Sequence, residues 1–356
     1  MNTVRCESVS LFTLTPGGQQ VANKLREHLP MECYCSEKYL QDGFKPFVDS
    51  FKNTLSQAFL RDSAIIVIGA CGIVVRTIAP LLQDKFTDPA VLVIDEKGKH
   101  VISLLSGHVG GANELARYLS HLIDGTAVIT TSTDVNQTCS FDLLAKQMCA
   151  DTIDFRVATK TINQMLVSGK QVGIIVDPFL VNQLDFDIHS FDIRGLTIVD
   201  DETISQHSLD ALIDVSMQST RPNWSVPTFQ LIPKRLVAGI GCRKGVEPDI
   251  LKSLFNSQLQ ALNIHPKALS IIGSIDVKRN EDAIVNLAKS YDVPFEVFSA
   301  DELNQCADRF PHSDFVAKTV GVGAVSQPAA WLLSNGSLLG DTIKQQGITI
   351  TYGVLN

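Results

Sequence analysis

Short apolar runs alternate with stretches of helical periodicity along most of the chain, and this alternation restricts the possible folds more than any other feature. Strands separated by helices favour a mainly parallel sheet with helices packed against its faces. A short turn joins the apolar runs 90–95 and 100–105. In the first 131 residues, strands are predicted at 9–15, 64–69, 90–95, 100–105 and 126–131, and helices at 19–29, 47–60, 73–82 and 109–123.

The alternation continues to the end of the chain with one interruption. Residues 216–233 show no clear period and contain three X-Pro pairs, which is typical of a linker. We therefore predict an α/β fold of two or three α/β domains with mainly parallel sheets and glycine-rich loops at the carboxyl ends of strands. The predicted divisions are an N-terminal domain at 1–150, an acidic middle region at 151–215, the linker at 216–233 and a C-terminal domain at 234–356.

The composition excludes several classes of protein. The 356 residues are 45% hydrophobic with a formal net charge of −8, which does not fit a disordered chain. The longest apolar run, 64–75, is well short of the roughly 20 residues that a membrane span needs. The first residues lack the basic and apolar regions of a signal peptide, so we expect a cytoplasmic protein with no membrane partner.

The distribution of charge matters more than its sum. An acidic chain is not expected to bind nucleic acid. Residues 151–214 carry 11 acidic and four basic side chains, so most of the negative charge lies in the middle region. The flanking segments are nearly neutral, and an anionic small molecule therefore remains a possible ligand for them.

Four glycine clusters follow apolar runs and precede helices, where open α/β sheets bind ligands. None of them completes a nucleotide motif, because Lys244 and Ser326 stand where a dinucleotide fingerprint has its third glycine. A Rossmann-type oxidoreductase therefore has little support. Simple tight turns between strand and helix are the alternative interpretation. The clusters lie at 69–72, 106–113, 239–245 and 321–323.

The cluster at 106–113 has the highest density of chemically useful side chains. His108 can exchange protons near neutral pH, Asn113 can donate to an oxyanion, and Glu114 can orient the histidine. Alternatively, a polar residue only caps the helix and His108 is a solvated loop residue. The cluster lacks G-x-S-x-G, and the chain lacks H-E-x-x-H and any C-x-x-C pair, so neither a serine nucleophile nor a metal site is predicted.

Two further segments carry polar groups that need partners. Arg76 interrupts an apolar helix and requires either an anionic ligand or a salt bridge with a carboxylate such as Asp88 or Asp95. Residues 130–136 offer several hydroxyl groups beside Asp134. They bind polar groups of a substrate, or they cap and turn the chain.

Taken together, these motifs resemble the cobalt-precorrin-5A hydrolase family of anaerobic cobalamin biosynthesis. The similarity is strongest from residue 69 to residue 136 and returns near the end of the chain. It rests on GACGIVVRTIAPL at 69–81, KFTDPAV at 85–91, LLSGHVGGANELA at 104–116, TTSTDVN at 130–136, GIGCRKG at 239–245 and KTVGVGAVSQPAA at 318–330.

This resemblance implies hydrolysis of the δ-lactone of cobalt-precorrin-5A with release of acetaldehyde, giving cobalt-precorrin-5B. It also implies that cobalt arrives with the corrinoid substrate, so that the protein needs no cofactor or metal of its own. A non-catalytic corrinoid-binding or handover protein of the same pathway is the alternative. A homodimer is possible.

The residue roles come from side-chain chemistry and not from the family. His108 is the expected general base and Glu114 its orienting partner or substitute. The oxyanion donors are expected to be Asn113 and the amides of Gly107, Gly110 and Gly111. The expected substrate-binding residues are Gly107, Gly110 and Gly111 through their amides, Arg76, Lys85, Arg243 and Lys244 for the peripheral carboxylates, and Thr131 and Asp134 for polar groups.

Overall fold

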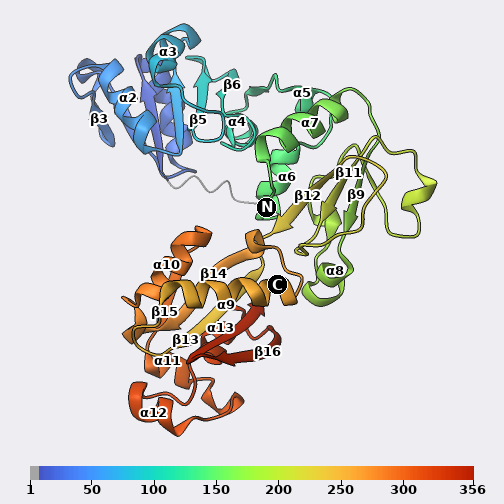
Figure 1. Ribbon diagram of the computed structural model, residues 1–356. Helices are drawn as coiled ribbons and strands as arrows, with labels where there is room; N and C mark the ends of the chain where they lie inside the picture. Colours follow the sequence, from blue (N-terminus) through green and yellow to red (C-terminus); the bar gives the residue numbers. More distant parts are fainter. Residues whose placement is uncertain (1–7) are drawn as a thin grey trace. The chain divides into compact units, whose positions relative to one another are not determined.

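A computed structural model describes residues 8–356 (Figure 1). The chain forms two compact units that divide between Leu143 and Leu144. Each unit has its own sheets and helices. In the described part of the chain, no helix is both long and apolar enough to cross a membrane.

The first unit is built on one seven-stranded sheet in the order β3-β2-β1-β4-β5-β6-β7. All neighbouring strands run parallel except β5 and β6. The strands are β1 Val9–Thr13, β2 Glu32–Cys35, β3 Phe44–Pro46, β4 Ala64–Ile68, β5 Ala90–Ile94, β6 His100–Leu105 and β7 Thr126–Val128. The helices are α1 Pro16–Arg26, α2 Phe51–Arg61, α3 Cys71–Ile78, α4 Ala112–Leu122, α5 Ser132–Val135 and α6 Phe141–Gln147, the last crossing the division.

The antiparallel pair β5–β6 decides where the loops of the first unit lie. The chain turns back within residues 95–99, so that Ile94 pairs with Val101 and Val91 with Leu105. The loop after β6 therefore lies at the edge of the sheet where β4 and β5 begin. The loop after β4 lies at the opposite edge, where Ile68 pairs with Ile94.

Helices cover both faces of this sheet. One core contains Val21 and Leu25 of α1 and Leu115 and Leu119 of α4. The core on the other side contains Leu55 of α2 and Val74 of α3, together with residues of the central strands. Each strand of the centre contributes alternate residues to the two cores, which explains why β4 and β5 are apolar throughout.

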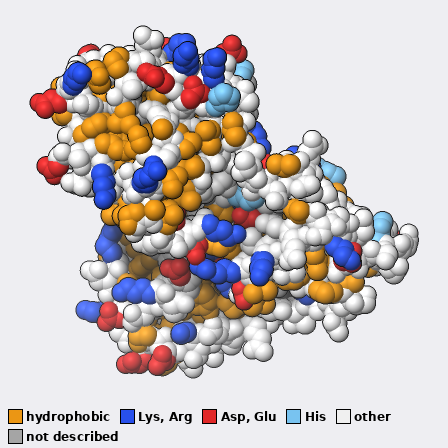
Figure 2. Space-filling view, turned by 90° about the horizontal axis from the view of Figure 1, so that it is seen from above, with side chains coloured by type: hydrophobic (Ala, Val, Ile, Leu, Met, Phe, Trp, Pro, Cys, Tyr) orange, Lys and Arg blue, Asp and Glu red, His pale blue; other side chains and the backbone are white. Residues whose placement is uncertain are grey.

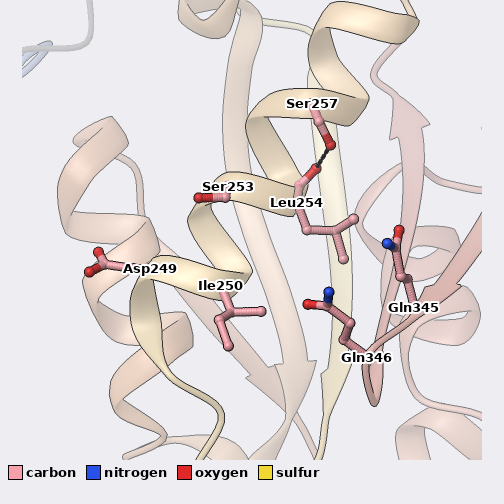
Figure 3. Close-up of a pocket in the computed structure, with 7 residues that line it drawn as sticks. All are labelled: Asp249, Ile250, Ser253, Leu254, Ser257, Gln345 and Gln346. Carbon is pink, nitrogen blue, oxygen red and sulfur yellow. Dashed lines mark hydrogen bonds between the residues drawn. The ribbon is translucent and has the colours of Figure 1, made fainter.

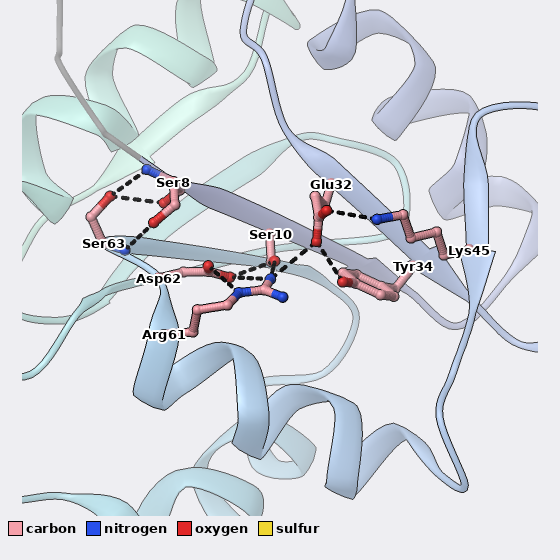
Figure 4. Close-up of polar contacts among 8 residues, drawn as sticks. All are labelled: Ser8, Ser10, Glu32, Tyr34, Lys45, Arg61, Asp62 and Ser63. Carbon is pink, nitrogen blue, oxygen red and sulfur yellow. Dashed lines mark hydrogen bonds and ion pairs between the residues drawn. The ribbon is translucent and has the colours of Figure 1, made fainter.

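A polar cluster closes the sheet where β1, β2 and β4 begin (Figure 4). The Asp62 carboxylate is 2% exposed and accepts hydrogen bonds from Ser10 Oγ at 2.6 Å and from Arg61 Nε at 2.7 Å. The Arg61 guanidinium also reaches Glu32, which accepts a hydrogen bond from Tyr34. The buried Asp62 carboxylate is thus hydrogen-bonded, as its burial requires.

The second unit contains two five-stranded sheets, in the orders β10-β9-β11-β12-β8 and β15-β14-β13-β17-β16. Their strands are β8 Ala150–Asp151, β9 Val172–Val176, β10 Leu196–Ile198, β11 Ala211–Val215, β12 Thr228–Pro233, β13 Leu236–Cys242, β14 Leu269–Ile275, β15 Phe295–Phe298, β16 Leu338–Gln345 and β17 Ile348–Val354. Their helices are α7 Phe155–Val167, α8 Pro178–Leu184, α9 Pro248–Ala261, α10 Asp282–Tyr291, α11 Ala300–Asn304, α12 Asp314–Val320 and α13 Ser326–Leu333.

The expectation of an α/β fold with mainly parallel sheets is confirmed. The predicted linker at 216–233 was wrong in its last third. Residues 228–233 form strand β12, which pairs in parallel with β11 and in antiparallel fashion with β8. Pro233 ends this strand opposite Ala150, at a position where the lost N–H costs little.

Candidate active site

The loop between β6 and α4 has a backbone that only a few residue types adopt easily. Ser106 has a φ of 56° and Gly111 a φ of 84°, both in the left-handed region. The Ser106 hydroxyl donates to the carbonyl oxygen of Asp88 at 2.9 Å, which ties the loop to the segment before β5. Because α4 has no side-chain cap, the carbonyl oxygens of Ser106 and Gly107 accept the first amides of the helix instead.

The His108 side chain lies among polar side chains of helices α5 and α6. Its Nε2 lies 2.8 Å from the Thr133 hydroxyl and 3.3 Å from Oδ2 of Asp134 on α5. Its Nδ1 lies 3.5 Å from Oδ2 of Asp142 on α6. The side chains of His108, Asp134 and Asp142 are 17%, 14% and 3% exposed. Both ring nitrogens therefore face carboxylates in a largely buried place.

The electrostatic environment favours the charged form of this histidine. Burial by itself lowers the pKa of His108, since it removes water from the imidazolium. The hydrogen bond and the charge of Asp142, with the charge of Asp134, outweigh burial, so that the net pKa is raised above 6.5. The ring is thus protonated over a wider pH range than a free histidine.

Asp134 connects this histidine to helix α4. Its Oδ2 accepts a hydrogen bond of 2.8 Å from Asn113 Nδ2, and its Oδ1 accepts one from Arg117. Asn113 Nδ2 also donates to the Thr131 hydroxyl at 3.0 Å. Thr131 and Asp134 were expected to bind substrate. Both instead accept hydrogen bonds from Asn113 and join helix α4 to the segment of α5.

The predicted oxyanion donors divide into two groups. Gly111 donates its amide to the carbonyl oxygen of His108, and the Asn113 amide group donates to Thr131 and Asp134. The amides of Gly107 and Gly110 have no acceptor among residues 8–356, and these two are available for an oxyanion. A side chain at Gly107 would place its Cβ 2.6 Å from Asn113 Oδ1 and would displace the Asn113 side chain.

Comparison with known proteins identifies the family. Residues 53–134 match the family description "Cobalamin synthesis G N-terminal", and residues 236–353 match "Cobalamin synthesis G C-terminus". The chain is 51% identical over 355 residues to the cobalt-precorrin-5A hydrolase of Salmonella typhimurium, covering 99% of both chains. The chain belongs to the cobalt-precorrin-5A hydrolase family. The resemblance inferred from the motifs is thereby confirmed.

More distant relatives match along the whole chain as well. The cobalt-precorrin-5A hydrolase of Priestia megaterium is 28% identical, over 97% of this chain and 94% of that protein. Among solved structures, a cobalamin biosynthesis protein G homolog from Sulfolobus solfataricus is 21% identical, covers 98% of this chain and 97% of that one, and has a TM-score of 0.41.

Within this family member, Glu114 does not take the place expected for it. It lies on an exposed side of α4, and no hydrogen bond or ion pair joins it to His108 in the part of the chain that the structure describes. Asp134 and Asp142 stand beside the imidazole instead. The reason is helical geometry, because the side chain three positions after the glycine N-cap turns away from the loop.

The two predicted cations of the first unit lie in different surroundings. Arg76 is exposed near the end of α3 and donates from Nη1 to the carbonyl oxygen of Gly72 at 3.1 Å, toward the edge of the sheet where β4 ends. Neither alternative salt bridge forms, since Asp88 accepts from Gln83 and Asp95 from Lys97. Lys85 is exposed in the segment before β5, the segment tied to the His108 loop through Ser106 and Asp88.

The other two cations belong to the second unit. Arg243 and Lys244 are exposed in the turn after β13, and among residues 8–356 neither forms an ion pair. The amide of Gly245 in the same turn donates to Glu281 at 2.8 Å. Figure 2 shows that Lys and Arg side chains are interspersed with Asp and Glu on the face of the molecule that it presents.

A separate pocket lies in the second unit, along α9 and the turn between β16 and β17 (Figure 3). It contains none of the predicted site residues. Its lining residues are Asp249, Ile250, Ser253, Leu254, Ser257, Gln345 and Gln346. A search of residues 8–356 found no group of three or more His, Cys, Asp and Glu side chains able to hold a metal ion.

Sequence analysis missed three residues that complete the His108 environment. Thr133 lies inside the segment 130–136, whose hydroxyls were noted without a role for each. Arg117 and Asp142 carry no motif of their own. The spacing of Arg117 four residues after Asn113 places both on one side of α4 and was the only signal available for it.

Proposed function

We propose that this family member hydrolyses the δ-lactone of cobalt-precorrin-5A and releases the two-carbon bridge as acetaldehyde, leaving cobalt-precorrin-5B. The observation that carries the proposal is the 51% identity, over 99% of both chains, to a relative named cobalt-precorrin-5A hydrolase. The reaction then breaks a carbon–carbon bond after the lactone has opened. The proposal includes no resident cofactor or metal, because cobalt belongs to the substrate.

Lactone opening requires proton transfer and a stabilised tetrahedral oxyanion. We assign proton transfer to His108, the one titratable group of the loop that is held by two carboxylates. The amides of Gly107 and Gly110, which have no acceptor in the described chain, are the proposed oxyanion donors. Asn113 contributes by holding Asp134 and Thr131 in place.

The second step needs the alcohol formed by lactone opening. When this hydroxyl loses its proton, the adjacent carbon–carbon bond breaks and acetaldehyde leaves, while the macrocycle accepts the electron pair. We assign the proton transfers of both steps to His108. The exposed Lys85, Arg243 and Lys244 side chains are proposed to bind peripheral carboxylates of the corrinoid. Arg76 is left out of this proposal, because it lies toward the opposite edge of the sheet from His108.

Anaerobic incubation of the full chain with cobalt-precorrin-5A tests the proposal. The expected result is stoichiometric acetaldehyde together with the matching mass loss in the tetrapyrrole. A folded chain that binds the corrinoid but releases no acetaldehyde would instead be the handover protein. A nicotinamide titration that detects binding would favour the oxidoreductase.

His108→Ala provides the test of the site. It should reduce acetaldehyde release at least 100-fold, which is the usual size of a proton-transfer contribution. Corrinoid binding, followed by the visible spectrum of the macrocycle, should change little. Normal acetaldehyde release from this variant would exclude His108 as the proton-transfer residue.

A further inference from the structure

Each ring nitrogen of His108 lies close to a carboxylate. Nε2 lies within 3.3 Å of Asp134, and Nδ1 lies 3.5 Å from Asp142. A neutral imidazole carries one N–H and one lone pair, so it offers an N–H to only one of the two carboxylates, and the lone pair on Nε2 would accept from the Thr133 hydroxyl. The imidazolium presents an N–H to each carboxylate and satisfies both.

Burial increases the energetic difference between the neutral imidazole and the imidazolium at this position. The Asp142 side chain is 3% exposed, and a carboxylate so buried requires a charged or hydrogen-bonded partner. On the other side of the ring, part of the Asp134 charge is shared with Arg117 and Asn113. Asp142 is also the more deeply buried of the two carboxylates beside the ring. The groups that face the ring are Thr133 and Asp134 on α5 and Asp142 on α6.

We propose that His108 enters the reaction as an imidazolium, and that Asp142 is the positioning residue that holds its charge and orientation. This inference rests on the proposed function and adds a residue and a starting charge to it. The histidine then acts first as an acid and only afterwards as a base.

The proton balance of such a cycle closes. Water adds its oxygen to the acyl carbon of the lactone, and its first proton passes to bulk water. The ester carbon–oxygen bond breaks, and the departing alkoxide takes a proton from His108. In the second step the hydroxyl returns that proton to the neutral ring, the carbon–carbon bond breaks, and the electron pair passes to the macrocycle as acetaldehyde leaves. His108 ends as it began, and no oxidant or reductant is consumed.

Asp142→Asn tests the positioning role because it removes the charge and keeps the shape of the side chain. The protein is labelled at histidine, and the NMR signal of the His108 ring is assigned by comparison with His108→Gln. The midpoint of its titration should move about one pH unit lower. The alkaline decline of kcat for acetaldehyde release should move by the same amount. Asp142→Glu keeps the carboxylate and should keep the ring titration near that of the unaltered chain.

A matched control exists elsewhere in the same unit. His100 Nδ1 lies 3.3 Å from Asp95, but both side chains are well exposed, at 57% and 38%. Asp95→Asn should leave the His108 titration and the kcat profile unchanged. Circular dichroism and the melting temperature establish that each variant is folded. Asp142→Ser, which also removes the charge, takes the place of the Asn variant if that variant does not fold.

The outcomes separate the two levels of the proposal. An unshifted His108 titration in folded Asp142→Asn overturns the role of Asp142. A kcat that rises with pH through the His108 titration overturns the acid-first cycle, since a base would be needed from the start. Absence of acetaldehyde from the unaltered chain at every pH overturns the proposed function itself, whatever the NMR titration shows.

Discussion

Leu105, the last residue of β6, pairs with Val91 near the start of β5. The loop that carries His108 therefore lies at the edge of the sheet where the neighbouring parallel strands begin. The glycine loop after β4 lies at the other edge, about 13 Å away along five-residue strands. Two sequence motifs that look equivalent as strand-to-helix loops are thus separated by the antiparallel hairpin.

This separation predicts different effects for the two cations of the first unit. Lys85→Ala should raise KM for cobalt-precorrin-5A about tenfold, the usual loss for one hydrogen bond to a charged group, because its segment is tied to the His108 loop. Arg76→Ala should change KM less than about twofold. Initial rates of acetaldehyde release measure both. Equal losses would show that one substrate reaches both edges of the sheet.

The carboxylates around His108 should differ sharply from Glu114 in their effect on catalysis. Asp134→Asn removes the charge and one of the two acceptor oxygens that join Asn113 and Arg117, and displacement of the loop should lower kcat about 100-fold. Glu114→Ala should leave kcat within about twofold, because the side chain is exposed. A large loss at Glu114 with a normal melting temperature would restore its predicted role.

The buried carboxylate of the polar cluster should matter for stability. Asp62→Asn exchanges an ionised acceptor for a neutral amide between Ser10 and Arg61, and should lower the free energy of unfolding by about 1–2 kcal/mol. The loss is limited because Arg61 is 55% exposed and regains water. Lys45→Ala, an exposed partner of Glu32, should cost less than about 0.5 kcal/mol in the same denaturant titration.

Glu32 should give the same cluster a dependence on acid. The hydrogen bond from Lys45, followed by that from Tyr34, lowers the pKa of Glu32 from 4.5 to about 2. A lowered folded-state pKa adds stability that is complete above the unfolded pKa and is lost as the pH falls from about 4.5 to 2. Because the side chain is 42% exposed, the gain is below about 1 kcal/mol. Unfolding curves of Glu32→Gln and the unaltered chain should therefore converge near pH 2.

Close packing in the second unit should make a substitution at one glycine destabilising. A Cβ at Gly239 in β13 would overlap the carbonyl oxygen of Ser326 and lie 2.6 Å from the Ala330 amide of α13. Gly239→Ala should therefore destabilise the chain by about 1–3 kcal/mol. At Gly69 the nearest atom would be 3.5 Å away, so Gly69→Ala should cost less. Similar melting temperatures for the two variants would contradict this explanation.

Local sequence signals predicted those elements whose ends carry turn residues. The predicted strand at 100–105 matches β6 residue for residue, and the predicted strands at 64–69 and 90–95 end one residue beyond β4 and β5. Strand β12 was missed because its pairing along β11 is a tertiary effect and because Pro233 resembles a break. Strand β2, Glu32–Cys35, has only four residues and is too short to show a period, yet it lies in the interior of the sheet.

The candidate site was predicted in part for the same physical reason. His108, Asn113 and the glycines are close in sequence, and their residue types announce their chemistry. Asp142 approaches the ring from 34 positions away, through the packing of two short helices. No local pattern encodes that approach. Glu114 was the nearest carboxylate in sequence but not in space.

The shared use of one carboxylate by several side chains has a thermodynamic consequence. Since Asp134 is the common partner of Asn113, Arg117 and His108, its loss already disconnects the other three. Double-mutant cycles that include Asp134 should therefore show strong coupling. The effects of the single substitutions at its partners should add up to more than the effect of the combined substitutions. The site behaves as one cooperative element, in which no residue has an independent contribution.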